Sequence, residues 1–257
     1  MFLAIDAGNT QTTFGLFEEG KIKFTFRLST KDILDKDVFA SLLNGSLKSL
    51  NLETSKIREI GISSVVPSVD HNLKYILEKL FNTSPFFISP EINLPFKLLV
   101  DNPSEVGADR ICNVAAGFEK YGGPLVIVDF GTATVYDVIS KNGDFLGGVI
   151  APGILTSAKA LFLAAEKLPE VELIFPEKVI GTNTISNMQA GIMFGALDSF
   201  EGMIRRIQKE LNDQVKVIAT GGFSKTIYTK TNMIYAVEFD LVLEGIKILY
   251  DKCYKKL

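Results

Sequence analysis

The chain has 257 residues, of which 47% are hydrophobic and 22% are charged, and its formal net charge is −3. This composition is typical of globular proteins with a hydrophobic core, and it excludes a disordered chain and a coiled coil. The slightly acidic balance provides no basic surface for a polyanion, so we expect no nucleic-acid partner.

The N-terminal apolar run is short and ends at Asp6, with no basic segment before it. We therefore expect neither a signal peptide nor a membrane span, and the predicted location is the cytoplasm. Cys112 and Cys253 are too few for a disulfide framework, and His71 is the single histidine of the sequence. Because these residues give little basis for a zinc site or a Ser or Cys triad, we expect any catalysis to rest on carboxylates.

Residues 1–15 predict a β-hairpin in which an apolar strand ends at Asp6 and a glycine turn with hydroxyl and amide side chains follows. Such a turn brings backbone N–H groups close to a phosphate, and an aspartate at the end of the strand can orient a hydrated Mg²⁺ ion. The hairpin therefore predicts a nucleotide site.

The rest of the N-terminal half alternates strands and helices. Its periodicity predicts, in order, an edge strand over 21–28, a helix capped at Ser29, a strand over 57–66, a helix over 69–81 and a short strand over 85–89. A β-hairpin followed by this alternation is the pattern of an α/β layer domain.

The segment after residue 101 combines a turn signal, Asn102–Pro103, with a predicted helix over 106–121. Near its start, the carboxylate of Asp109 stands beside the guanidinium of Arg110 at a domain junction, where ligands often bind. A surface ion pair at the start of a helix explains the same residues equally well. Spacing alone leaves both interpretations open.

A second hairpin over residues 125–143 repeats the first. Aligning Asp6 with Asp129 also aligns the turn glycines Gly8 and Gly131, without a gap. An Asp-x-Gly turn is common, but two at matching positions predict a duplicated domain whose loops face one cleft.

A chain of 257 residues can form one large domain or two of ordinary size, and the repeat favours two. We expect an N-terminal lobe over residues 1–101 and a C-terminal lobe over residues 102–257. The C-terminal lobe is predicted to carry the substrate pocket.

The second hairpin is followed by Leu146–Gly153, which holds three glycines and a proline and predicts a loop packed closely against its surroundings. The remaining pattern predicts a helix over 153–167, an extended acidic segment over 168–176, a long helix over 186–211, a strand over 215–220 and a last helix over 241–255. Small residues along the long helix suit an interdomain or subunit contact.

Gly221 and Gly222 follow the strand over 215–220 and can let the backbone pass beneath a flat ring such as adenine. A plain turn explains the same two residues. The order of two Asp-x-Gly hairpins and then a strand with Gly-Gly favours the adenine site, because it resembles the actin, Hsp70 and sugar kinase superfamily.

Over nearly its whole length the chain resembles the type III pantothenate kinases. The motifs that carry this resemblance are Asp6-x-Gly8-Asn9-Thr10, Asn102-Pro103-x-Glu105-Val106-Gly107-Ala108-Asp109-Arg110, Asp129-Phe130-Gly131-Thr132-Ala133-Thr134, Gly147-Gly148-x-Ile150-x-Pro152-Gly153, Leu168-Pro169-x-Val171-Glu172-Leu173, Asn183-Thr184 and Thr220-Gly221-Gly222. The resemblance implies an α/β fold of two duplicated ribonuclease H-like (actin-like ATPase) domains with mixed sheets flanked by helices.

The same resemblance implies that the chain uses ATP to phosphorylate the primary hydroxyl of pantothenate to 4′-phosphopantothenate, the first step toward coenzyme A. It implies Mg²⁺ near Asp6 and a monovalent cation, K⁺ or NH₄⁺, at Asp129. The residues expected to bind ATP are Asp6, Ala7, Gly8, Asn9, Thr10, Gln11, Thr12, Thr13, Thr132, Gly221 and Gly222.

For the substrate, the resemblance implies that Asp109 is the general base. The residues expected to line the pantothenate pocket are Val100, Gly107, Ala108, Asp109, Arg110 and Thr184. Members of this family are generally homodimers with the substrate pocket near the subunit interface, so a homodimer is expected here.

Two positions depart from the family pattern. Val100 stands where many members carry an aromatic residue, usually Tyr, and Val135 follows Thr134 where a second Thr is common. The first departure keeps open a kinase that acts on another small hydroxy acid. A non-catalytic ATP-binding protein with a transcriptional accessory role is the other alternative, although a binding protein would not need to keep Asp109.

Overall fold

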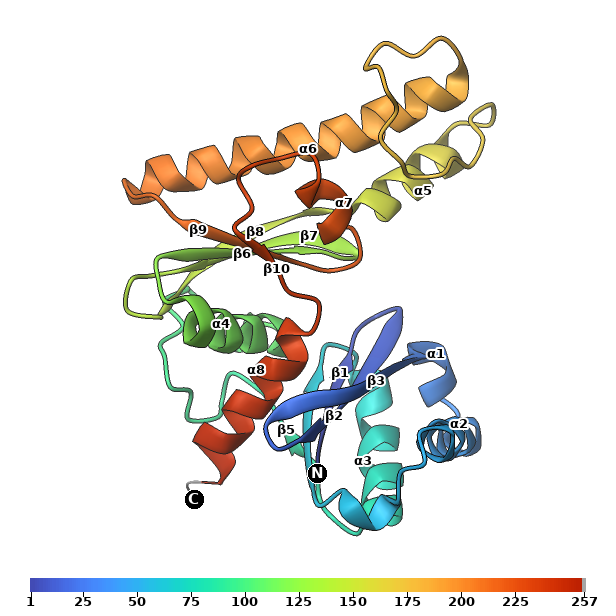
Figure 1. The fold of residues 1–257 in the computed structure, drawn as a ribbon, viewed down its shortest axis with the longest axis vertical. Coiled ribbons are helices and arrows are strands. Elements are labelled where there is room, and N and C mark those ends of the chain that lie inside the picture. The colour runs from blue at the N-terminus through green and yellow to red at the C-terminus, as the bar shows by residue number, and fades with distance from the viewer. Residues whose placement is uncertain (256–257) are drawn as a thin grey trace. The chain divides into compact units, whose positions relative to one another are not determined.

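The structure is a computed structural model that describes residues 1–255. Within these residues ten strands form two sheets of five strands each, and contacts divide the chain into two compact units (Figure 1). The first unit comprises Met1–Lys120 together with the chain from Asp240 onward, and the second comprises Tyr121–Phe239.

The first sheet has the strand order β3-β2-β1-β4-β5. Its strands are β1 (Phe2–Ala7), β2 (Gln11–Glu18), β3 (Lys21–Ser29), β4 (Glu59–Ser64) and β5 (Phe86–Phe87). β1, β2 and β3 form an antiparallel meander, whereas β4 runs parallel to β1 and β5 runs parallel to β4. Because β1 is central and covered on both faces, its apolar residues are almost fully buried.

The second sheet repeats this arrangement in the order β8-β7-β6-β9-β10. Its strands are β6 (Leu125–Phe130), β7 (Ala133–Ile139), β8 (Phe145–Pro152), β9 (Lys216–Thr220) and β10 (Ala236–Val237). Again the first three strands are antiparallel and the last two are parallel. The repeated topology confirms the predicted class, an α/β fold built from two duplicated mixed sheets flanked by helices.

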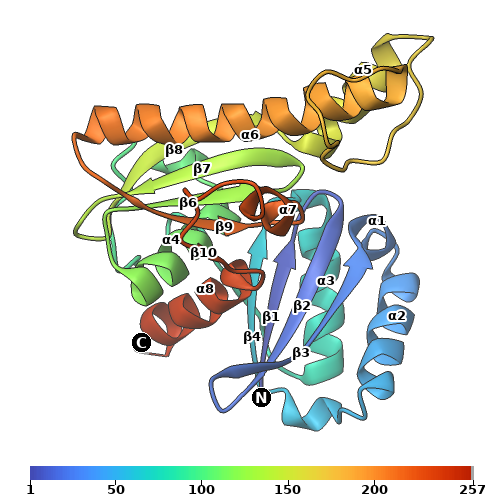
Figure 2. The same cartoon turned by 45° about the horizontal axis from the view of Figure 1, so that its top comes forward.

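The helices of the first unit cover both faces of its sheet. They are α1 (Thr30–Ile33), α2 (Lys36–Ser49), α3 (Pro67–Phe81), α4 (Ala108–Tyr121) and α8 (Leu241–Leu249), with short 3₁₀ turns at Thr54–Lys56 and Pro103–Glu105 and a π-helical turn at Tyr250–Tyr254. Figure 2 shows α1, α2 and α3 on one side of the sheet and α8 on the other. The Asn72 side chain joins α3 to α1 by donating to the carbonyls of Ile33 at 3.0 Å and Leu34 at 2.9 Å.

Glycines let α8 approach its neighbours in the first unit. A Cβ at Gly61 on β4 would lie 2.6 Å from the Ile246 side chain, and a Cβ at Gly245 would lie 2.0 Å from the backbone oxygen of Cys112 on α4. α8 is therefore packed between the sheet and α4, with no room for a larger residue at Gly245.

The helices of the second unit are α5 (Ile154–Ala164), α6 (Thr184–Leu211) and α7 (Ser224–Tyr228). α6 runs along one face of the second sheet (Figure 2) and buries Phe200 and Ile204 there. The Phe200 ring packs edge-on against Phe130 of β6 with a centroid separation of 5.6 Å. Among the described residues, each helix is too short or too polar to cross a membrane.

Two local predictions are wrong. The helix predicted from Ser29 is divided at Leu34, because the Asp35 side chain accepts the N–H groups of Asp37 and Val38 at 2.9 and 3.1 Å and starts α2. The segment predicted as a glycine-rich loop is strand β8, which pairs with β7 at the sheet edge. Its glycines allow an irregularity in the pairing, where Gly147 has a φ of +111°.

The compact units do not end where the repeat places the domain boundary. Residues 102–120 and the chain from Asp240 onward belong to the first unit, because α8 packs on β1 and β4 and Gly245 lies against α4. The predicted boundary between residues 101 and 102 concerns the duplicated lobes and stays a prediction. The compact units are divided elsewhere, after Lys120 and before Asp240.

We expect Gly245→Ala to lower the free energy of unfolding by about 1–3 kcal/mol, because its methyl group would collide with the Cys112 carbonyl. Gly45→Ala on α2 is the matched control: its Cβ would meet nothing within 4 Å, so the change should stabilise the helix by about 0.5–1 kcal/mol. Urea unfolding of both variants checks this. Equal stability of the two variants would contradict the described packing of α8.

Candidate functional site

The turn between β1 and β2 is held closed by hydrogen bonds. The Gly8 N–H donates to the Gln11 carbonyl at 3.1 Å, and the Thr30 hydroxyl donates to the Gly8 carbonyl at 2.6 Å. The buried Thr12 hydroxyl lies 3.0 Å from that of Thr30, so the Thr12 side chain supports the turn from inside the fold. Within this turn, the predicted phosphate-binding residues that are exposed are Asn9, Thr10 and Gln11.

Asp6 lies near the carboxyl end of β1, just before this turn. In the parallel pairing of β1 with β4, Asp6 stands opposite Ser63, whose hydroxyl donates to Asp6 Oδ1 at 3.2 Å. Carboxylate oxygens are the donors that Mg²⁺ prefers, and Mg²⁺ is usually held by one or two protein carboxylates together with phosphates and water. The donor set at this turn fits that ion.

Asp109 lies in the first turn of α4 and is partly buried. Its Oδ1 accepts the Arg110 N–H at 2.8 Å. A Cβ at Gly107 would lie 2.6 Å from the same oxygen, so the glycine leaves space for the carboxylate. Burial raises the pKa of Asp109, and this effect outweighs the opposing influence of the Arg110 N–H and of the Arg110 charge.

Cys112, one turn after Asp109 on α4, shows that Asp6 and Asp109 lie in the same region of the first unit. Burial raises the pKa of the Cys112 thiol well above its ordinary value, and the negative charges of Asp6 and then Asp109 add to this effect. A hydrogen bond with Ser63 opposes it. The thiol is therefore protonated at neutral pH and poorly suited to act as a nucleophile.

Asp129 and the Gly221–Gly222 turn come together in the second unit. Asp129 of β6 pairs in register with Thr220 of β9, directly before the glycines. Gly221 has a φ of +86°, and a Cβ there would lie 2.3 Å from Asp129 Oδ1 and 2.7 Å from the Phe130 nitrogen. Only glycine fits this position, because both the backbone angle and the close approach exclude a side chain.

Thr132 is exposed at the tip of the second Asp-x-Gly turn. Its carbonyl accepts the Gly153 N–H at 3.1 Å and the Thr156 hydroxyl at 2.6 Å. A Cβ at Gly153 would lie 2.3 Å from the Gly131 oxygen, so the start of α5 packs directly on the turn. The second turn is thus fixed by its backbone, and the Thr132 hydroxyl is left at the surface.

The remaining predicted residues lie farther along the chain. Val100 is partly exposed in the irregular segment before the 3₁₀ turn at Pro103–Glu105. Thr184 is exposed at the first position of α6, whose Asn183 cap accepts the Ser186 N–H at 2.9 Å. The predicted site residues are therefore divided between the two units, and their roles toward ligands stay predictions.

Sequence reasoning missed Ser63, Thr30 and Thr156, which hold the predicted residues in place. For Ser63 a signal existed: a polar residue near the end of an apolar strand that pairs with the strand of Asp6. For Thr30 and Thr156 the partners are backbone carbonyls of distant turns, which leave no pattern in the sequence.

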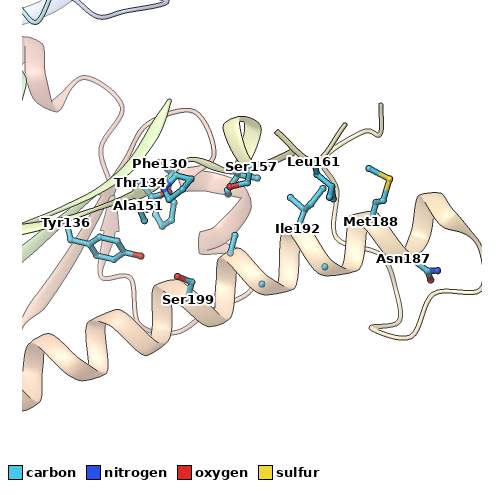
Figure 3. A pocket seen from close by; sticks show the side chains of 15 residues that line it. Phe130, Thr134, Tyr136, Ala151, Ser157, Leu161, Asn187, Met188, Ile192 and Ser199 are labelled. Carbon is cyan, nitrogen blue, oxygen red and sulfur yellow. The ribbon is translucent and has the colours of Figure 1, made fainter. Parts of the chain in front are cut away.

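A cavity of about 620 Å³ lies in the second unit between the sheet, α5 and α6. Figure 3 shows Tyr136 at one end and Leu161, Ile192 and Met188 toward the other. Burial raises the pKa of Tyr136 to about 12. Among the described residues that line this cavity none is charged, so it offers no ionic partner to a phosphate or a carboxylate.

Comparison with known proteins gives one family match. The family model described as type III pantothenate kinase matches residues 2–206. This range contains both Asp-x-Gly turns, the Asp109 segment and Thr184.

Solved structures resemble the chain in fold. A Campylobacter jejuni protein assigned to the Baf family of transcriptional activators is 20% identical, with a TM-score of 0.64 over 99% of this chain and 100% of its own. A Sinorhizobium meliloti protein assigned as a 2-dehydro-3-deoxygalactonokinase is 13% identical, with a TM-score of 0.59 over 98% and 96%. Component A of (R)-2-hydroxyglutaryl-CoA dehydratase from Acidaminococcus fermentans is 12% identical, with a TM-score of 0.56 over 99% and 98%.

The raised pKa of Asp109 predicts a pH-dependent stability difference between the wild type and Asp109→Asn. At a pH below 3.8, the ordinary pKa of an aspartate, the carboxyl is protonated in both the folded and the unfolded states. Its ionisation then does not change the free energy of unfolding. As the pH rises through the folded-state pKa, the folded state loses stability, because it must ionise a partly buried group.

Asp109→Asn should therefore be more stable than the wild type at pH 8, and the advantage should shrink as the pH falls toward 3.8. Melting temperatures of both proteins across this range provide the measurement. An advantage that grows toward acid pH would mean that the folded protein lowers the Asp109 pKa.

Proposed function

The chain belongs to the type III pantothenate kinase family, and from this premise we propose that it transfers the γ-phosphoryl group of ATP to the primary hydroxyl of pantothenate, forming 4′-phosphopantothenate. The observation that carries the proposal is the Asp109 carboxylate, held at the start of α4 by Gly107 and the Arg110 N–H within the matched range. Phosphoryl transfer needs positioning and charge neutralisation more than covalent catalysis, so one well-placed carboxylate can suffice.

Asp109 is proposed as the general base. Its carboxylate accepts the proton of the attacking hydroxyl as the new bond to phosphorus forms, and the ADP oxygen leaves on the opposite side. A base works best when its pKa lies near the operating pH, and the raised pKa of Asp109 supports this role. The neighbouring guanidinium of Arg110 suits an anionic group such as the pantothenate carboxylate.

The exposed backbone and side chains of the β1–β2 turn are proposed to bind ATP phosphates, since a closed glycine turn presents N–H groups to an anion. Mg²⁺ would be held by the Asp6 carboxylate, and when bound it neutralises charge that develops on the phosphates. Thr132 is proposed for the phosphates, and Gly221 with Gly222 for the adenine.

Asp129 is proposed to bind a monovalent cation, K⁺ or NH₄⁺, because its carboxylate lies against the backbone of Gly221.

Val100 and Thr184 are proposed to contact pantothenate. We also propose a homodimer, and the small residues of α6 suit a close subunit contact. Val100 in place of an aromatic residue is the one feature that favours a different hydroxy acid as the acceptor.

Purified protein with ATP, Mg²⁺ and K⁺ should convert pantothenate to 4′-phosphopantothenate and turn over sugars and other hydroxy acids far more slowly. A coupled assay of ADP release with each acceptor, repeated without K⁺, measures this. Faster turnover of another hydroxy acid would identify that acid, and not pantothenate, as the substrate. Inactivity with every acceptor, with and without K⁺, would favour the non-catalytic nucleotide-binding alternative.

Asp109→Asn should lower kcat by roughly 10²–10⁴-fold, the usual contribution of a general base, while the circular dichroism spectrum stays that of the wild type. Asp37→Asn, at an exposed position in the first turn of α2, is the matched control and should keep kcat within about twofold. If Asp109→Asn keeps the kcat of the wild type, Asp109 is not the general base.

A further inference from the structure

The Ser63 hydroxyl is a fixed part of the first unit. Ser63 is 0% exposed, and its position opposite Asp6 is set by the parallel register of β4 with β1. The hydroxyl donates to Asp6 Oδ1 at 3.2 Å. Because buried polar groups are almost always hydrogen-bonded, this contact satisfies the buried hydroxyl.

Ser63 also lies beside the fully buried Cys112 thiol of α4. A serine hydroxyl has one proton, and the hydrogen bond to Asp6 uses it. Because Ser63 is itself fully buried, water does not reach its hydroxyl.

Ser63 lies close to two other elements of the first unit. Cys112 lies one turn after Asp109 on α4, whereas Asp6 lies on β1. The hydroxyl of Ser63 thus restrains the Asp6 carboxylate close to the helix that carries Asp109. A carboxylate restrained in this way presents its oxygens in one direction. An unrestrained aspartate side chain samples several rotamers and directions.

We propose that Ser63 is a positioning residue, whose hydroxyl holds the Asp6 carboxylate in the orientation that binds the divalent cation of the nucleotide. The proposal rests on the proposed function for the assignment of Asp6 to Mg²⁺. Hydrogen-bond partners of metal-binding side chains typically contribute roughly 10–100-fold to metal affinity, because they restrict the ligand to its productive orientation.

Ser64 provides a matched control at the next position of the same strand. Its hydroxyl donates to the Asp70 carboxylate at 2.5 Å and accepts the Val66 N–H at 3.2 Å. Ser64→Ala therefore removes a serine hydroxyl that bonds to an aspartate, as Ser63→Ala does. Asp70 lies on α3 and has no assigned role in catalysis or binding, so the two variants differ in which carboxylate loses its partner.

The test measures binding of Mn²⁺, as a paramagnetic probe for Mg²⁺, in the presence of a non-hydrolysable ATP analogue and without any acceptor. Free Mn²⁺ is followed by electron paramagnetic resonance. Ser63→Ala should weaken Mn²⁺ binding about tenfold, and Ser64→Ala should stay within about twofold of the wild type. Ser63→Thr keeps the hydroxyl and should restore binding, and melting curves confirm that each variant is folded.

Equal Mn²⁺ affinities in Ser63→Ala and Ser64→Ala would overturn the positioning role, as would a wild type that binds no Mn²⁺ with the nucleotide. The acceptor is absent from this experiment. A wrong substrate assignment would therefore be revealed in the kinase assay, while the effect of Ser63 on Mn²⁺ binding would be unchanged.

Discussion

The Asp109 carboxyl lies in the first turn of α4, where burial opposes its ionisation while the helix N-terminus and the Arg110 N–H favour it. Burial is the stronger effect, so the folded protein holds a carboxyl group that is harder to ionise than an exposed one. This arrangement costs stability at neutral pH and supplies a more basic carboxylate. Gly107, directly before α4, leaves the space that this carboxyl group occupies.

Three glycines lie unusually close to a carboxylate or to backbone atoms at predicted site residues. Gly107 leaves space for Asp109, Gly221 leaves space for Asp129, and Gly153 lets α5 begin against the second turn. At Gly221 and Gly153 the nearest atoms include backbone, which cannot move aside as a flexible side chain can. These glycines allow the close packing around the carboxylates and turns, and the two Asp-x-Gly turns lie at equivalent places in two sheets of the same topology.

The repeated Asp-x-Gly hairpins predicted a duplicated domain, because strand periodicity and turn residues are local signals, and the family resemblance implied the two mixed sheets. Long-range packing was not predictable in this way. The pattern at Leu146–Gly153 indicated a loop, yet pairing with β7 makes it a strand. Likewise the sequence shows Ser63 only as a polar residue near a strand end, whereas its partner Asp6 lies 57 positions earlier on a strand that only folding brings beside it.

Asp109 is proposed to accept the proton of the attacking hydroxyl. The most direct test is the pH dependence of kcat/KM for pantothenate phosphorylation in the wild type and in Asp109→Asn. We predict that the wild-type rate falls on the acid side with an apparent pKa above 3.8, the ordinary value for an aspartate, and that this fall is absent from the residual activity of the variant. The same acid-side fall in both proteins would contradict the assignment of Asp109 as the base.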